Sequence, residues 1–86
     1  MLTRVLAREL GSYNIRANAL GPGLTKTEAN RPRWTNPEYL KQREAAIPLG
    51  RAADPYDMVG TALFLASDAS NYITGQTILV EGGVSA

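Results

Sequence analysis

Cysteine and histidine are both missing from this 86-residue chain. Without them the chain has no disulfide framework, no thiolate nucleophile and none of the usual zinc sites. The absence of histidine also excludes a Ser-His-Asp mechanism. An oxygen-only metal site would need clustered carboxylates, and the nearest pairs in sequence are Asp54 with Asp57 and Glu38 with Glu44. We interpret Asp54 and Asp57 as residues of a helix start, and we predict no metal site.

Long apolar runs and a large charge of one sign are missing too. No stretch is long enough to span a bilayer, and the first residues lack a signal-peptide core. The net charge is +1 and the basic residues are scattered along the sequence, with no run of like charge. We therefore expect neither nucleic acid nor a membrane as a partner. The default expectation is a soluble, cytoplasmic protein.

The length allows one small domain of marginal stability. Hydrophobic residues make up 44% of the chain and charged residues 20%, which is the balance of a globular protein. A globular chain of this length buries only about 60–65% of its unfolded surface.

The chain begins with a helical pattern. Leu2, Val5, Leu6 and Leu10 recur at helical spacing, and Gly11 is the expected stop. No capping residue precedes the apolar face, and the pattern is already running at the first residue. We therefore predict that residues 1–11 are the tail of a longer helix.

A strand and a tight turn are predicted next, over residues 15–23. The apolar run begins at Ile15 and ends at Gly21-Pro22-Gly23, a strong turn signal. We interpret Asn18, inside this strand, as a hydrogen-bonding residue of the structure. The polar residues from Leu24 to Arg33 are predicted to form a loop, within a region 24–53 that also holds a short helix.

Two helices and a second strand follow. Thr35 and Glu38 fit a capping box, so a helix is expected to begin there and to end before Pro48. A last long helix is predicted over residues 54–68, with Asp57 near its positive end. The apolar run 77–80 predicts a strand covered on both faces, closed by glycines within 77–83.

This order of elements predicts the α/β class. Two strands joined by a long crossover with helices are expected to be parallel. Two parallel strands cannot form a sheet covered on both faces, so residues 1–86 are predicted to be a single partial domain, incomplete on its N-terminal side.

Four motifs over nearly the whole chain resemble the short-chain dehydrogenase/reductase family. They are Ile15–Gly23 followed by Thr27, the Pro-Leu-Gly-Arg of 48–51 followed by Pro55, the Phe-Leu-Ala-Ser-Asp of 64–68, and the Ile-Thr-Gly-Gln of 73–76 followed by the Val-Glu-Gly-Gly of 80–83. The resemblance implies the C-terminal part of a Rossmann-like, doubly wound parallel sheet. It also implies NAD or NADP as the cofactor of a complete member, which would oxidise alcohols or reduce ketones.

The same resemblance shows what this chain lacks. The family's phosphate-binding glycine loop has no counterpart, because Lys26 stands where Gly21-x-Gly23 would need its third glycine. The catalytic Tyr-x-x-x-Lys pair is absent as well, since no tyrosine is followed by lysine four residues later. Tyr39 with Arg43 comes nearest, but arginine does not replace that lysine. We predict no catalytic residue here and little or no tight cofactor binding by the chain alone.

Candidate binding residues fall in two groups. Pro22, Gly23, Thr25 and Thr27 match positions that the family places beside the nicotinamide, although Thr25 stands where the family usually has an aliphatic residue. Arg31, Trp34 and Tyr39, with Arg33 and Arg43, lie in the segment that matches the family's substrate cover. The alternative for both groups is a solvated turn and loop, with Trp34 packed onto the core.

Three functions remain open at this point. The chain is a segment of an NAD(P)-dependent oxidoreductase, inactive alone, or a non-catalytic module that associates with itself or a relative, or a small ligand-binding protein. For the second we expect contacts through residues 54–67 and 77–80, because exposed strand edges and apolar helix faces favour pairing.

Overall fold

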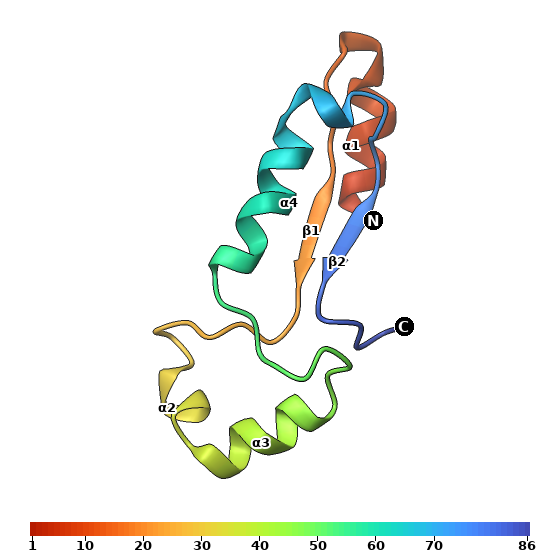
Figure 1. The fold of residues 1–86 in the computed structure, drawn as a ribbon. Coiled ribbons are helices and arrows are strands. Elements are labelled where there is room, and N and C mark those ends of the chain that lie inside the picture. Colours follow the sequence, from red (N-terminus) through yellow and green to blue (C-terminus); the bar gives the residue numbers. More distant parts are fainter.

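The structure, a computed structural model, describes all 86 residues. Two strands lie side by side with α1 and α4 beside them, and α2 and α3 form a second lobe beyond the ends of the strands (Figure 1). The elements in chain order are α1 (Leu2–Leu10), the 3₁₀ helix η1 (Gly11–Tyr13), β1 (Ala19–Pro22), α2 (Arg31–Trp34), α3 (Pro37–Ala45), α4 (Tyr56–Ala66), the 3₁₀ helix η2 (Asp68–Ser70) and β2 (Thr77–Val80).

The sheet is parallel, as the order of elements predicted. Ala19 pairs with Thr77, and the register continues to Pro22 with Val80. Gly21 has no side chain to clear at this pairing, where a Cβ would lie 2.7 Å from Cδ2 of Leu79. The chain therefore has the α/β architecture of a partial Rossmann-like sheet, with the carboxyl ends of both strands at the same edge.

β1 begins at Ala19, later than the predicted start at Ile15. Before Ala19 the backbone pairing continues only through the N–H of Gly75, which donates to the carbonyl of Ala17, and side chains supply the other hydrogen bonds. Asn18 donates through Nδ2 to the carbonyl of Ile73 and accepts through Oδ1 from the N–H of Gln76. The hydroxyl of Thr74 accepts from the N–H of Ala17. The structural interpretation of Asn18 is confirmed, and its amide is what ends the regular pairing.

α1 ends at Leu10 with Gly11 as its cap, as predicted, but the capping of two helices differs in detail from the prediction. Gly11 does not stop the chain in a left-handed conformation: its φ is −57°, and it continues into η1. Asn14 takes the left-handed conformation instead, with φ of 59°. At α3 the cap is Asn36, whose Oδ1 accepts from the N–H groups of Glu38 and Tyr39. The hydroxyl of Thr35 donates to the carbonyl of Arg31, so the capping box of Thr35 and Glu38 does not form.

α4 begins at Tyr56 and packs along both strands. The side chain of Asp57 accepts from the backbone N–H of Asp54 at 2.8 Å, which places both residues at the start of the helix. At the other end, the guanidinium of Arg16 donates to the carbonyls of Ser67 and Ser70 and to the hydroxyl of Ser70. Arg16 thus ties the end of α4 to the segment before β1.

Little of the molecule is buried. Only Ala7, Ile47, Ala52 and Ser70 fall in the buried class. The radius of gyration is 15.8 Å, whereas a compact domain of this length would have about 12 Å. Leu63 of α4 is 65% exposed and Leu79 of β2 is 54% exposed. The two-stranded sheet and its helices therefore leave apolar faces uncovered, in agreement with a fold that is incomplete as a domain.

Candidate functional site

The turn after β1 is fixed against the end of β2. The N–H of Gly23 donates to the carbonyl of Val80 at 2.9 Å, which extends the pairing by one residue beyond the strand. A Cβ on Gly23 would lie 2.8 Å from both Cα and Cβ of Glu81. Only glycine fits this close approach, so Pro22-Gly23 is held at the carboxyl edge of the sheet, where α/β folds bind ligands.

The side chain of Asn30 holds residues 25–27, which follow this turn, in place. Its Oδ1 accepts from the N–H of Thr27 at 2.8 Å and from the hydroxyl of Thr27 at 3.0 Å, and its Nδ2 donates to the carbonyl of Thr25 at 2.9 Å. The hydroxyl of Thr25 donates to the carbonyl of Gly23. Thr25 and Thr27 are therefore parts of one hydrogen-bonded loop, in which Thr27 is exposed to solvent. The sequence interpretation missed Asn30, although asparagine in a polar loop is a known signal for such side-chain turns.

Several backbone donors of this loop have no partner in the chain, and two of them, Leu24 and Thr25, directly follow the turn. Residues 25 and 53 form an isolated parallel bridge in which Lys26 N–H and Ala53 N–H donate. The N–H groups of Leu24 and Thr25 take no part in it and donate no hydrogen bond within the chain. Two consecutive free donors at a strand's carboxyl end suit a carbonyl or carboxamide oxygen of a ligand.

Trp34 closes the loop from α2. Its Nε1–H donates to the carbonyl of Thr27 at 2.8 Å. The ammonium of Lys26 and the guanidinium of Arg31 lie 5.7 and 5.9 Å from the ring centroid. Trp34 packs on the loop and two cations, and the alternative in which it fills the core is wrong.

α3 adds Tyr39 and Arg43. The two residues lie one helical turn apart, and Nη1 of Arg43 donates to the hydroxyl of Tyr39 at 2.6 Å. The Asn36 cap fixes the start of this helix and hence where Tyr39 lies. The spacing is that of a Tyr-x-x-x-Lys pair, but a guanidinium stands where that pair has the ammonium of lysine, and the two groups are not interchangeable.

The loop, α2 and α3 together line one open groove with a volume of about 380 Å³. This volume falls in the range of small-molecule sites, roughly 300–1,000 Å³. Of the predicted residues the groove gathers Pro22, Gly23, Thr25, Thr27, Trp34 and Tyr39. Arg31 is not among its lining residues, because it stacks on Trp34 and pairs with Glu28 at 3.4 Å.

The charge of this groove is one-sided. Residues 24–43 contain five basic and two acidic residues, a net charge of +3 in a chain whose total is +1. Arg33 and Arg43 line the groove, and no aspartate or glutamate does. The basic residues are scattered along the sequence, and the turn between α2 and α3 brings two of them, Arg33 and Arg43, to one surface.

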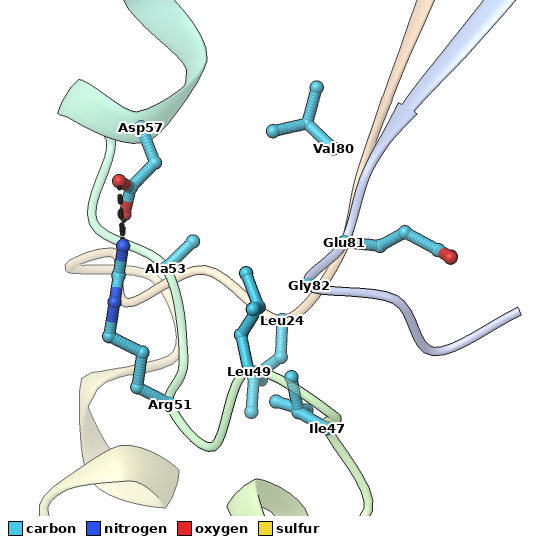
Figure 2. Close-up of a pocket in the computed structure, with 9 residues that line it drawn as sticks. All are labelled: Leu24, Ile47, Leu49, Arg51, Ala53, Asp57, Val80, Glu81 and Gly82. Atoms are coloured by element: carbon cyan, nitrogen blue, oxygen red, sulfur yellow. Dashed lines mark hydrogen bonds and ion pairs between the residues drawn. The ribbon is translucent and has the colours of Figure 1, made fainter. Parts of the chain in front are cut away.

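A second cavity lies on the other side of Leu24, which lines both. Figure 2 shows Leu24, Ile47 and Leu49 gathered at its centre, and the carboxylate of Glu81 pointing away from them. Its volume is about 140 Å³, which is below the usual range for a small-molecule site. This cavity is a packing feature that joins the segment 47–57 to the end of β2.

An ion pair borders this second cavity. Arg51 donates to both carboxylate oxygens of Asp57, at 2.8 and 3.0 Å, as Figure 2 shows. The hydrogen bond from Arg51, with the second from the N–H of Asp54, lowers the pKa of Asp57 to about 2. The pKa of Glu81 is also lowered, by hydrogen bonds from the hydroxyl and N–H of Ser85. Both groups have structural partners, and neither is available as a general base.

No group of three or more carboxylates gathers in a way that would hold a metal ion. None of the helices combines the length and the apolar character that crossing a membrane would need.

Comparison with known proteins agrees with this architecture. A sequence profile described as "Enoyl-(Acyl carrier protein) reductase" matches residues 1–85. The L-rhamnose-1-dehydrogenase of Scheffersomyces stipitis is 48% identical over 83 residues, which cover 96% of this chain and 32% of that protein.

Solved structures match the fold equally well. A gluconate 5-dehydrogenase from Burkholderia cenocepacia, in complex with NADP and tartrate, superposes with a TM-score of 0.93 at 36% identity. The match covers 99% of this chain and 33% of that one. A short-chain type dehydrogenase/reductase from Mycobacterium ulcerans gives 0.90 at 35% identity, over 96% of this chain and 30% of the other.

The fold is that of part of a Rossmann-like α/β sheet. The comparisons make the assignment specific: this chain belongs to the short-chain dehydrogenase/reductase family, as its motifs indicated. It spans about a third of the length of the relatives it matches.

Proposed function

We propose that this chain supplies the cofactor-contacting turn and the substrate-covering segment of an NAD(P)-dependent oxidoreductase that interconverts alcohol and carbonyl groups. The observation that carries the proposal is the groove itself. Its floor is the turn after β1, with two free backbone donors, and its wall is the segment of α2 and α3.

The residues present fit one end of a nicotinamide cofactor. The free N–H groups of Leu24 and Thr25 are suited to a carboxamide oxygen, and Gly23 leaves room for close approach. The side chain of Thr27 is held by Asn30 at the same edge. A bound nicotinamide would supply the hydride acceptor or donor of the reaction. The dinucleotide's phosphates would be held elsewhere, since the chain has no glycine-rich loop.

Within this proposal the chain's own residues position the cofactor and cover the substrate. They do not transfer the proton of the reaction. Oxidation of an alcohol removes a hydride from carbon and a proton from oxygen, and the proton needs a base near the hydroxyl. Tyr39 is the one tyrosine of the groove, and its partner is the guanidinium of Arg43 and not the lysine of a Tyr-x-x-x-Lys pair. The proton-transfer group therefore comes from a further part of the enzyme.

A graft tests the proposal. The matching last third of the S. stipitis L-rhamnose-1-dehydrogenase is replaced by this chain, and cofactor-dependent turnover of alcohol and sugar substrates is measured. We expect a folded hybrid with activity, and a rise in the KM for the cofactor when Thr27 is changed to Val. A folded hybrid that binds the cofactor through its own glycine loop but turns over no substrate would overturn the proposal. The matched control, Thr61→Val on α4, alters a threonine outside the groove.

Self-association is a second candidate, and the exposed apolar faces favour it. Val59, Leu63 and Phe64 of α4 and Leu79 of β2 are all in the exposed class. We propose that the stretches 54–67 and 77–80 bury these faces against a second copy or a relative, because water exposure of such an area is unfavourable. Light scattering of the chain and of Leu63→Glu tests this. A mass of two or more copies that falls to one in the variant supports it, and an unchanged mass in the variant contradicts it.

A further inference from the structure

The groove contains two guanidinium groups whose charge nothing in the chain balances. Arg33 makes no side-chain hydrogen bond and no ion pair, and the one hydrogen bond of the Arg43 guanidinium goes to the neutral hydroxyl of Tyr39. The other arginine of this segment, Arg31, has Glu28 as its partner. Arg4 and Arg8, on α1, also lack an acidic partner, but they line a different surface. Arg33 and Arg43 are the two that line this groove, and neither has an acidic partner in the chain.

The rest of the lining does not compensate these charges. The remaining residues are neutral, with hydroxyl, amide, indole and phenol groups beside Pro22, Gly23 and Leu24. Lys26 adds a further positive charge behind Trp34, 5.7 Å from its ring. An arginine fork matches the two oxygens of a carboxylate or a phosphate, and such charge-assisted hydrogen bonds are the strong ones. The groove is thus complementary to an anion.

We propose that Arg33 and Arg43 bind the carboxylate of the substrate, and that the substrate is a hydroxy acid or the corresponding oxo acid. This inference rests on the proposed function, because it assigns the groove to the substrate. The geometry supports that assignment: the free N–H groups of Leu24 and Thr25 stand at the strand end, and the two arginines come from α2 and α3 at the far wall. An acid with its reacting carbon near the turn would place its carboxylate toward the helices.

Phosphate groups of the cofactor are the other anions that the two arginines could bind. The test therefore separates a substrate carboxylate from a phosphate. Trp34 is the only tryptophan of the chain and lines the groove, which makes its fluorescence a direct probe. The 86-residue chain is titrated with D-gluconate, with the neutral polyol sorbitol and with inorganic pyrophosphate, at low ionic strength. Sorbitol has a hydroxymethyl group where gluconate has the carboxylate, so the pair isolates the effect of the charge.

A lysine on the same helix as Arg43 provides the control for the arginine variants. Arg33→Gln and Arg43→Gln each remove one groove cation. Lys41→Gln removes the same charge from the same helix as Arg43, but Lys41 lines a different surface with Pro37 and Leu40. Arg43→Lys keeps the charge and loses the fork. Because Arg33 makes no side-chain hydrogen bond, its replacement leaves the fold in place, and circular dichroism of each variant verifies this.

We expect gluconate to change the Trp34 emission in a saturable, salt-sensitive way and sorbitol to leave it unchanged. Each arginine variant should weaken gluconate binding by about threefold to tenfold, and Lys41→Gln by much less. Arg43→Lys should fall between the wild type and Arg43→Gln.

Equal responses to gluconate and sorbitol, or equal affinities in Arg33→Gln and Lys41→Gln, would overturn the proposal. Saturation by pyrophosphate without a response to gluconate would assign the arginines to the cofactor and overturn it as well. The titration needs no turnover, so an inactive graft leaves its result standing. A graft that is active on neutral sugars alone would refute the acid substrate while it supports the proposed function.

Discussion

Asn30 gives the sharpest test of the site, because one side chain makes three hydrogen bonds to the loop. We predict that Asn30→Ala releases residues 25–27 while the rest of the chain keeps its fold. The lost bonds join Oδ1 to the N–H and hydroxyl of Thr27 and Nδ2 to the carbonyl of Thr25. Since the loop is partly exposed, water compensates most of each bond, and each is worth the lower end of roughly 0.5–1.5 kcal/mol.

The expected loss in the free energy of loop closure is about 1–2 kcal/mol, the sum of three such bonds. This corresponds to a rise of about five- to thirtyfold in the equilibrium constant for opening the loop. The measurement is amide hydrogen exchange at Thr27, whose N–H donates to Asn30 in the closed loop. Trp34 emission should shift to the red in parallel, because its Nε1–H bonds to the carbonyl of Thr27.

Two further variants complete this experiment, one with a partial loss of the hydrogen bonds and one as a control. Asn30→Asp keeps the acceptor for Thr27 and loses the donor to the carbonyl of Thr25, so it should lose about half as much. Asn71→Ala removes an exposed asparagine whose side chain makes no hydrogen bond and should change neither observable. If the exchange of the Thr27 amide is the same in Asn30→Ala and Asn71→Ala, the argument that Asn30 organises the site is refuted.

Three further predictions concern stability and its dependence on pH. Asn36→Ala should destabilise α3 by about 1 kcal/mol, measured as lost helical ellipticity, because the cap satisfies two N–H groups. Gly60→Ala should stabilise the chain by about 0.5–1 kcal/mol in urea titrations, since a Cβ there meets open space in a helix. Gly23→Ala should destabilise the chain, because a Cβ there would lie 2.8 Å from Glu81, just after β2. The pKa of Asp57, lowered to about 2 from 3.8, means that its pairing with Arg51 stabilises the fold above pH 3.8 and is lost as the pH falls toward 2. Asp57→Asn should flatten this acid limb of the stability curve, and an unchanged limb would contradict the assignment.

The helix over 56–66 and the strand over 77–80 were predictable because their signals are local. Asp57 in the first turn and an apolar stripe define α4, and a run of four β-favouring residues defines β2. The start of β1 was not predictable in the same way. Asn18 bonds to Ile73 and Gln76, more than fifty residues away, and no neighbour in sequence indicates that pairing.

The site, like the fold, was predictable where its signals are local. Eight of the nine candidate binding residues line one groove, because the turn motif and the polar segment after it mark that edge of the sheet. Arg31 was assigned to the groove wrongly: in the short helix α2 it lies against Trp34 and Glu28, while Arg33 lines the groove. In a helix, side chains two positions apart lie on different faces, so Arg31 and Arg33 face different surfaces. The sequence did not indicate that residues 31–34 are helical.

The sequence by itself determined the parallel α/β class, the family and the place of the turn, because these follow from patterns between neighbouring residues and from motifs in order. Only the tertiary structure decided which cations face the groove and which backbone donors are left free. Both depend on contacts between segments far apart in the chain, as between Leu24 and Ala53 or between the loop and α3. A hydrogen bond or an unbalanced charge belongs to an arrangement in space, and the order of residues alone does not contain it.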